Sequence, residues 1–476
     1  MIHEQNGPGY GQLRTLGIAL SMVLMHWAHG CLTPYLVLLF DWVLRDWHDQ
    51  ARVFITSLIA NLLSGAKLPQ FVASAQDRIE LAYLNPQPND TIARFDYETH
   101  SAQLCAHPPT WPDNTKGIST LRLTLKLRPT GLLSGLRGPV EQHIDIVDYP
   151  GEWLLDLGLM DKSYEEWSTD VLHRMANRSF GADYVNALTD LDPSAPFTDT
   201  AAKSIAAHFT DYLENARVAG YSDLSPGRFL LPGDMAGSPA LTFAPVPKPT
   251  GSIRKTFWAE MKRRYDAYKT HVVRPFFRDH FSKIDRQIVL VDLLSALDNG
   301  PDALSDLQRT MSDVVRAFRP GQNSFLTRLV SGQRVDKILF AATKADHLHH
   351  TQHGNYTNIM RAIMDDALRH AKFRGAQTAA LSLASVRSTT EALHEDHPCV
   401  RGTLLSSRKN TLSYAGSLPE NAQQLLRDIS DGRSNWLGAE FTSTPFAPPV
   451  DAFHPDRGIA HIRLDQSLEF LLGDRI

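Results

Sequence analysis

Short apolar runs that alternate with helical patterns dominate the second half of this chain, and this alternation constrains its fold more than any other feature. The runs Arg286–Leu293, Asp336–Ala342 and Thr378–Leu383 have the composition of buried strands. Apolar residues at helical spacing fill Ala303–Phe318 and Tyr356–Lys372 between them. Strands and helices that alternate in this way predict an α/β fold whose sheet is mostly parallel and covered by helices.

Two further strands are expected upstream. Ser119–Arg128 alternates leucines with polar residues, and Val140–Asp148 is an apolar run with β-branched residues. The Gly/Pro-containing connection Pro129–Pro139 joins them, so an antiparallel pair is expected. Helical patterns then occupy Tyr164–Arg178, Ala201–Val218 and Ile253–Val273, which predicts a helical insertion between the strands.

Composition excludes several classes of protein. The 476 residues include 43% hydrophobic and 21% charged residues, which is ordinary for a globular protein. The formal charge of -4 gives no reason to expect nucleic acid as a partner. Three scattered cysteines are too few for a disulfide framework or a zinc site, and they favour a cytoplasmic location.

The stretch Val140–Trp153 carries the first candidate chemistry. Its strand stops at Asp148, and Pro150-Gly151 then forces a turn. A carboxylate at the end of a buried strand can hold the water shell of Mg²⁺, and the Gly151 N–H can meet a terminal phosphate oxygen. The alternative is an ordinary strand that runs into a tight turn.

A second candidate follows the strand Asp336–Ala342, at Thr343-Lys344-Ala345-Asp346. Guanine presents N1–H and N2–H₂ side by side, and the carboxylate of Asp346 could accept both hydrogen bonds, whereas adenine has an acceptor at N1. The aliphatic stem of Lys344 could lie on the base plane. After the next strand, Ala384-Ser385 could offer a backbone N–H to the base. These signals all lie at the carboxyl ends of strands, where α/β proteins bind nucleotides.

Two weaker candidates lie in polar connections. Thr115, upstream of the predicted hairpin, is placed where a switch-type NTPase has a second Mg²⁺ ligand, although a plain polar turn is an equal alternative. Four histidines, His347, His349, His350 and His353, follow Asp346 in one connection without a partner ligand at regular spacing. We expect them to form a solvated polar loop and not a metal site.

The first 52 residues differ in sequence pattern from the rest of the chain. The helix that begins near Val53 has no good capping residue before it. A second reading frame joins the third base of each codon to the first two bases of the next codon. In this frame the genetic code permits only Gly at Trp42-Val43, only Ala at Trp47-His48 and only Leu at Asp46-Trp47. The remaining junctions allow GLARSGK directly before this helix, which is a glycine-rich phosphate loop. We therefore predict that residues 1–52 are translated out of frame, a genuine divergent amino terminus being the alternative.

The motifs DYPGEWLLDL, RFLLPGDMAGSPAL, DRQIVLVD, LFAATKADH, LASV and HIRLDQSLEFLLGD together make the chain resemble the YcjX family, bacterial stress-associated P-loop NTPases. The resemblance runs from about Val53 to Ile476. It implies a Ras-like P-loop domain that binds GTP or GDP with Mg²⁺, with ATP as an alternative. Asp148 and Gly151 match the metal- and γ-phosphate-sensing motif, and Thr343, Lys344 and Asp346 match the base-reading one. Glu152 stands where many GTPases have a water-orienting Gln.

The sequence patterns, the codon argument and the resemblance together divide the chain into an out-of-frame amino terminus (1–52), a nucleotide domain in two parts (53–155 and 281–387), a helical insertion (156–280) and a carboxyl-terminal lobe that docks on the core (388–476). The first hypothesis is a cytoplasmic Mg²⁺-dependent GTPase that acts as a stress-response switch on an unknown protein partner, with a membrane-associated partner left open. The second is a pseudo-NTPase, because the phosphate loop is missing. The third is a membrane anchor through Leu16–Leu44, which His26, His29, Pro34 and Asp41 disfavour.

Overall fold

The computed structural model describes residues 50–113, 117–130, 138–279, 284–317, 335–373, 375–430, 437 and 441–476, and describes 35–42 as backbone. An eight-stranded mixed sheet forms its centre, in the order β2–β4–β5–β1–β6–β7–β8 with β3 beside β4. The strands are β1 Tyr35–Trp42, β2 Ile79–Asn85, β3 Ala93–Arg94, β4 Ser119–Leu127, β5 Val140–Asp148, β6 Arg286–Val291, β7 Lys337–Ala342 and β8 Gln377–Ser382. Strands β5, β1, β6, β7 and β8 pair parallel, which agrees with the α/β class expected.

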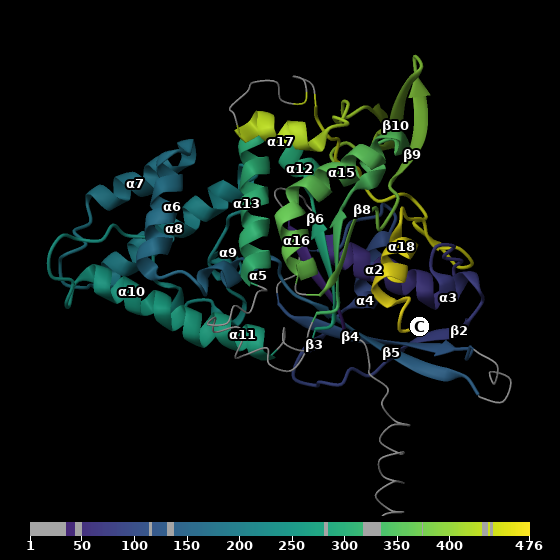
Figure 1. Cartoon of the computed structure of the whole chain (residues 1–476), viewed down its shortest axis with the longest axis horizontal. Coiled ribbons are helices and arrows are strands. Elements are labelled where there is room, and N and C mark those ends of the chain that lie inside the picture. The colour runs from purple at the N-terminus through teal and green to yellow at the C-terminus, as the bar shows by residue number, and fades with distance from the viewer. Residues whose placement is uncertain are drawn as a thin grey trace, which may run out of the picture.

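Helices cover both faces of this sheet because its strands are apolar on both sides. In β6, Ile288 and Leu290 pack with α2 (Gln50–Leu63) and α18 (Leu464–Leu472). Val289 and Val291 point the other way, into the core formed with α13 (Pro301–Ala317), α15 (His353–Ile363) and α16 (Asp365–Phe373). Figure 1 shows α2 and α18 on one side of β6 and β8 and α13, α15 and α16 on the other. The period of two in a strand produces this three-layer arrangement.

The predicted hairpin is confirmed. Strands β4 and β5 pair antiparallel, with Leu121 opposite Ile146 and Leu123 opposite Ile144. The leucines of β4 lie in the same core as α2. Strand β2, which the sequence pattern did not reveal, extends this side of the sheet by pairing antiparallel with β4. Its burial is partial, with only Ala82 buried, so it lacks the periodic apolar signal of its neighbours.

The central strand is the main difference from the sequence prediction. Strand β1 lies in the segment 1–52 that was set apart from the nucleotide domain, yet its backbone pairs parallel with both β5 and β6. Its sequence, YLVLLFDW, is a nearly continuous apolar run of the kind that a strand between two parallel neighbours requires. Helix α2 begins at Gln50, three residues before the expected start. The rest of the apolar stretch Leu16–Leu44 lies outside the described residues, among which no helix is long and apolar enough to cross a membrane.

Helices between β5 and β6 form a separate bundle at the left of Figure 1. They are α6 Tyr164–Ala176, α7 Ala182–Thr189, α8 Asp199–Val218, α10 Phe257–Tyr268 and α11 Arg274–Asp279. Side chains of Ser163, Thr198 and Thr256 cap the amino termini of α6, α8 and α10. The long helix expected over Ile253–Val273 is α10 followed by one π-helical turn, Lys269–Val273. Aromatic packing holds the bundle, with the rings of Trp167 and Tyr265 stacked at 5.0 Å.

The remaining elements are shorter. The helices are α3 Val72–Ala75, α4 Tyr97–Leu104, α5 Glu152–Leu155, α9 Gly227–Leu230, α12 Leu293–Asp298 and α17 Ala422–Ser430. Strands β9 Thr389–His394, β10 His397–Thr403 and β11 Asn410–Ser413 form an antiparallel sheet, and β12 Phe453–His454 pairs with β13 Gly458–Ile459.

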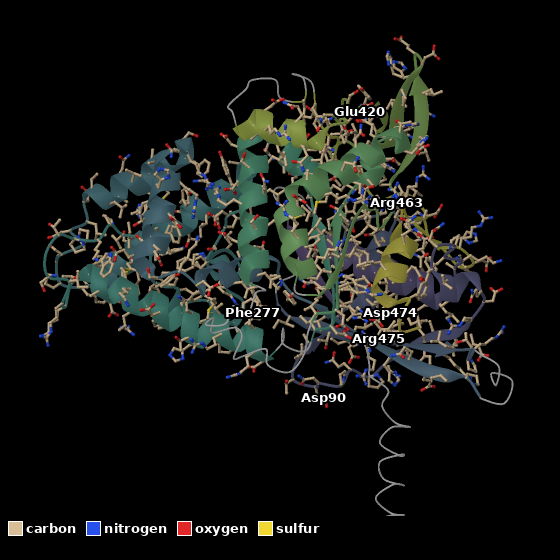
Figure 2. The ribbon with its side chains drawn as sticks, in the orientation of Figure 1. Asp90, Phe277, Glu420, Arg463, Asp474 and Arg475 are labelled. Carbon is tan, nitrogen blue, oxygen red and sulfur yellow. The ribbon has the colours of Figure 1, made fainter. Side chains whose placement is uncertain are left out.

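Helix α18 is fastened to the sheet at both of its ends. Before its first turn, Arg463 donates to the carbonyl oxygen of Ser382 at 3.1 Å and to its hydroxyl at 2.7 Å, at the end of β8. After its last turn, Asp474 accepts bonds from Arg286 and Lys337 at 2.8 and 2.7 Å, at the starts of β6 and β7. Figure 2 shows Arg463 and Asp474 at opposite ends of this helix. The residues that flank this helix therefore join the carboxyl end of β8 to the starts of β6 and β7.

Candidate functional site

Polar residues gather at one edge of the sheet because the parallel strands end there. Asp148 ends β5, Asp292 follows β6, and Asp346 and Ser385 come shortly after β7 and β8. In the sheet order, β1 and β6 lie between β5 and β7. Three strand spacings of about 4.8 Å place the ends of β5 and β7 about 14 Å apart along this edge. The two carboxylates thus lie on the same rim of the molecule.

Asp148 lies beside the first turn of helix α2. Its side chain is 1% exposed, and its Oδ2 is 3.8 Å from the Nε of Arg52. Arg52 also donates from Nη1 to the carbonyl oxygen of Asp113 at 2.8 Å. The first turn of a helix presents backbone N–H groups and a partial positive charge, which attract anions. The carboxylate of Asp148 therefore borders a position where an anion and a cation could both be held.

Gly151 and Glu152 form the turn that follows Asp148. Gly151 is buried and has φ -60° and ψ -33°, at the position that precedes α5, so it adopts a conformation open to any residue. Glu152 is the first residue of α5. The structure thus shows a helical turn directly after β5, which is compatible with both readings of the sequence motif.

Asp346 is held rigidly by residues that follow β8. Its Oδ2 accepts hydrogen bonds from the backbone N–H of Ser388 at 2.8 Å and from the Ser388 hydroxyl at 2.5 Å. The side chain is 4% exposed, and burial raises the pKa of Asp346, while the bonds from Ser388 oppose that rise. Since both bonds fall on one oxygen, the orientation of the carboxylate is fixed.

Lys344 makes a contact that the sequence prediction did not include. It has a left-handed backbone (φ +59°), and its ammonium group donates to Oδ2 of Asp292 at 2.7 Å with both side chains buried. Burial raises the pKa of Asp292 to about 7, although the hydrogen bond from the backbone N–H of Ser295 opposes that rise. The N–H of Thr343 donates to the carbonyl oxygen of Val291 at 2.9 Å. These bonds tie the end of β7 to the end of β6, and the stacking of the Lys344 stem on a base stays a prediction.

The turn after β8 lies against helix α2. Ser57 of α2 donates from its hydroxyl to the carbonyl oxygen of Ser385 at 2.5 Å. The Ala384 N–H donates to the carbonyl oxygen of Ile462 at 3.1 Å, and Ile462 donates back to Ala384 at 2.8 Å. Because the Ala384 N–H is engaged in this way, a backbone N–H offered to a base would have to come from Ser385. Thr115 lies outside the described residues.

The helical insertion contacts the turn that follows Asp148. The N–H of Gly227 donates to Oδ1 of Asp156 at 2.8 Å, and Trp153 donates from its indole N–H to the carbonyl oxygen of Leu231 at 2.9 Å. The guanidinium of Arg228 lies 3.2 Å from the centre of the Trp153 ring. Burial raises the pKa of Asp156 to about 7, although the bonds from Tyr268 and Gly227 oppose the rise. Any movement of residues 151–156 must therefore disturb the insertion.

Replacing Gly227 by Ala is expected to loosen this contact. A Cβ at position 227 would lie 2.0 Å from the carbonyl oxygen of Glu152, which is backbone and cannot rotate away. We expect Gly227→Ala to lower the free energy of unfolding by about 2–4 kcal/mol, measured by urea denaturation. Gly354→Ala is the matched control, because that glycine lies in helix α15 with nothing within 4 Å of its Cβ position. It should stabilise the protein by up to about 1 kcal/mol, and an equal loss in both variants would contradict the packing argument.

Three residues of this rim were not singled out from the sequence. Asp292 follows an apolar strand just as Asp148 ends one, so the same signal could have found it. Ser388 lies three residues after Ser385, and no local pattern indicates that it bonds to Asp346. Arg52 was assigned to the segment set apart from the domain, and only the structure places it beside Asp148.

Comparisons with known proteins bear on this arrangement. The model of the YcjX-like family, DUF463, matches residues 51–476. A protein of Escherichia coli (strain K12) named Ras-like GTPase YcjX is 36% identical over 441 residues, which cover 89% of this chain and 92% of that protein. A protein of Shewanella oneidensis with the same name is 33% identical over 461 residues, which cover 89% of this chain and 91% of that protein.

Proposed function

The chain belongs to the YcjX-like family, DUF463, and on that premise we propose that it is a Ras-like GTPase switch built on a P-loop nucleotide domain. The substrate would be GTP with Mg²⁺, and GDP the product that stays bound. Relatives that carry the name Ras-like GTPase support the general class. The nucleotide would lie along the rim formed by β5, β1, β6, β7 and β8, where the chain crosses from one side of the sheet to the other.

The observation that carries this proposal is the contact between Arg52 and Asp148, 3.8 Å apart. Arg52 directly precedes Val53, and the second reading frame ends its loop here with a Lys, after which the loss of two bases would have deleted a Thr or Ser codon. A hydroxyl at that place would lie near the carboxylate of Asp148, as is needed if both are to hold one Mg²⁺ or its water ligands. Strand β1 and helix α2 also supply the strand and helix between which a phosphate loop lies.

The other end of the rim fits a guanine base. The carboxylate of Asp346 has one oxygen fixed by Ser388, so its plane is set before a ligand arrives. An ionised carboxylate in this position would accept the two adjacent donors of guanine. Adenine, and hence ATP, offers only one donor and an acceptor at this edge, so the proposal favours GTP over ATP.

The residues present fit Mg²⁺ only in part. Asp148 is a buried carboxylate beside a helix amino terminus, and Mg²⁺ would reduce the charge repulsion between phosphate oxygens when bound there. However, the guanidinium of Arg52 already neutralises Asp148, and the sequence contains no G-x-x-x-x-G-K. Asp148, Gly151 and Glu152 would thus serve the chemistry only once a phosphate loop is present.

The second candidate function, a pseudo-NTPase that no longer binds nucleotide, rests on this missing loop. In both candidate functions, the contacts of Gly227 and Arg228 with the segment after Asp148 would couple the conformation of the helical insertion to the conformation of the site. A regulatory protein partner, membrane-associated or not, would bind the insertion in one of these conformations. A role in a stress response is part of the same proposal.

Nucleotide binding by the chain as it stands separates the two candidates. The GTPase candidate predicts that Mg²⁺–GDP at millimolar concentration raises the thermal unfolding midpoint, whereas the pseudo-NTPase candidate predicts no shift, because a phosphate loop normally supplies most contacts to the phosphates. Differential scanning fluorimetry with GDP and with ADP measures this directly. Micromolar binding of GDP by the unaltered chain would eliminate the pseudo-NTPase candidate and would show that residues other than a G-x-x-x-x-G-K loop hold the phosphates.

A further inference from the structure

Two histidines of the connection after Asp346 meet a carboxylate from a different element. His349 and His350 follow β7, and Glu391 lies in the middle of strand β9. Their possible ligand atoms all lie within 4.8 Å of one another. The sequence prediction of a solvated polar loop missed this group because Glu391 lies more than forty positions away from His350. The tertiary structure supplies the third ligand.

The distances suit a divalent metal that takes nitrogen and oxygen ligands. Nδ1 of His350 is 2.9 Å from Oε2 of Glu391, and Nε2 of His349 is 3.9 Å from the same oxygen. Tetrahedral zinc with bonds of about 2.0–2.2 Å separates its ligand atoms by about 3.3 Å. Small rotations of the His350 and Glu391 side chains, which are 62% and 35% exposed, would bring the three atoms to this spacing.

Neighbouring groups orient the ligands. The imidazole of His349 is oriented by Thr351, whose backbone N–H donates to Nδ1 at 3.4 Å and whose hydroxyl lies 3.0 Å from the same nitrogen, so that Nε2 faces Glu391. The guanidinium of Arg387 lies 3.8 Å from Oε1 of Glu391, whereas both histidines approach Oε2. The carboxylate can therefore bind a metal with one oxygen while the other faces Arg387.

We propose that His349, His350 and Glu391 form a zinc site with a fourth position left for water. Two imidazoles and a carboxylate form a ligand set that suits zinc better than Mg²⁺ or Ca²⁺, because those two ions prefer oxygen ligands. Zinc takes the place of the proton between His350 and Glu391, and that proton passes to solvent. The site is independent of the nucleotide proposal, because it includes none of the residues assigned to the nucleotide.

The zinc site joins the same two segments as the base-reading residue. Asp346 is bonded to Ser388, and Thr389 donates to the carbonyl oxygen of Asp346 at 2.5 Å. His350 and Glu391 continue this junction a few residues further along both segments. A bound zinc ion would therefore stabilise the strand β9 against the turn that carries Asp346. The role of zinc at that turn would therefore be structural.

Zinc titration of the untagged, chelator-treated full chain tests the proposal, with affinity measured against a chromophoric zinc chelator. We expect one equivalent to bind, with Glu391→Gln and His350→Ala each weakening the affinity by at least about 100-fold. His394→Ala is the matched control, because His394 is an exposed histidine of the same strand and lies opposite His397. It should bind zinc as the parent does.

Cobalt substitution supplies a second readout, since the visible spectrum of Co²⁺ bound by two histidines and a carboxylate has tetrahedral intensity. Circular dichroism verifies that each variant is folded, and Glu391→Gln keeps the size of the side chain. Absence of stoichiometric zinc binding would overturn the proposal. So would zinc binding that is unchanged in Glu391→Gln and His350→Ala, or that is lost in His394→Ala. None of these results depends on whether the chain binds nucleotide.

Discussion

Replacing residues 46–52 by Gly-Leu-Ala-Arg-Ser-Gly-Lys-Thr is expected to raise the affinity for Mg²⁺–GDP by at least about 1,000-fold, or about 4 kcal/mol. The replacement restores the GLARSGK loop that the second reading frame allows and adds one residue, a threonine, directly before Val53. Consecutive backbone N–H groups and the lysine would then meet the phosphates at the amino terminus of α2. Isothermal titration calorimetry of the parent and the replaced chain with GDP measures the gain.

Removal of Arg52 contributes to this expected gain. In the present chain its guanidinium lies 3.8 Å from Asp148, and a cation there competes with Mg²⁺ for the carboxylate. The replacement puts a threonine hydroxyl next to Val53 instead, so that Asp148 and the hydroxyl can share one metal ion. The gain should therefore depend on Mg²⁺, and titration in the presence of a chelator should abolish most of it.

The matched control is the same replacement with alanine in place of the loop lysine. It keeps the glycines and the chain length but removes the charge that would meet the β-phosphate, so most of the gain should disappear. A replaced chain that is folded, as judged by its circular dichroism, and yet binds no GDP would refute the P-loop proposal. Binding that is equally tight with the alanine loop would refute the role of the restored lysine.

Asp346→Asn in the chain with the restored loop is expected to weaken GDP binding by at least about 30-fold, or about 2 kcal/mol. The amide keeps one oxygen that can accept the two bonds from Ser388, so the turn should stay in place. Its NH₂ group, however, would face the donors of guanine and could not accept from them. ADP binding should change little, so the ratio of the GDP and ADP affinities is the quantity to measure.

The pH dependence gives an independent check on this role. Burial raises the pKa of Asp346 above its ordinary value. Only the ionised carboxylate accepts both guanine donors, so GDP affinity should fall as the pH decreases through that raised pKa, and the Asp346→Asn variant should lack this component. Asp336→Asn is the control, because Asp336 lies before β7 at the opposite edge of the sheet and should leave the affinity ratio unchanged. A GDP preference that survives Asp346→Asn would disprove the assignment.

Much of the fold could be predicted from the sequence because each strand carries its own apolar signal. The runs that became β4 to β8 are largely apolar and partly or fully buried, and their boundaries agree within two residues with those expected. Strand β2 could not be predicted in this way, since it lies near the edge of the sheet and buries little of its surface. Strand β1 was missed for a different reason, because its segment was judged by its reading frame and not by its apolar content.

The candidate site was predictable where a residue is marked by its place at the end of a strand. Asp148 and Asp346 are such residues, and the parallel pairing places them on one rim. Contacts between distant segments left no local trace in the sequence. The pairs Lys344–Asp292, Asp346–Ser388 and Arg52–Asp148, and the approach of Gly227 to Glu152, all join residues that periodicity cannot relate.

The sequence by itself determined the α/β class, the order of the main strands and the residues that end them, since apolar periodicity and turn residues are local properties of the chain. Only the tertiary structure decided which strand fills the centre of the sheet, which part of the insertion touches the turn after Asp148, and that Glu391 joins His349 and His350. Those outcomes depend on packing between segments far apart in the chain. Such packing is set by the shape and burial of the whole core, which no short stretch of sequence specifies.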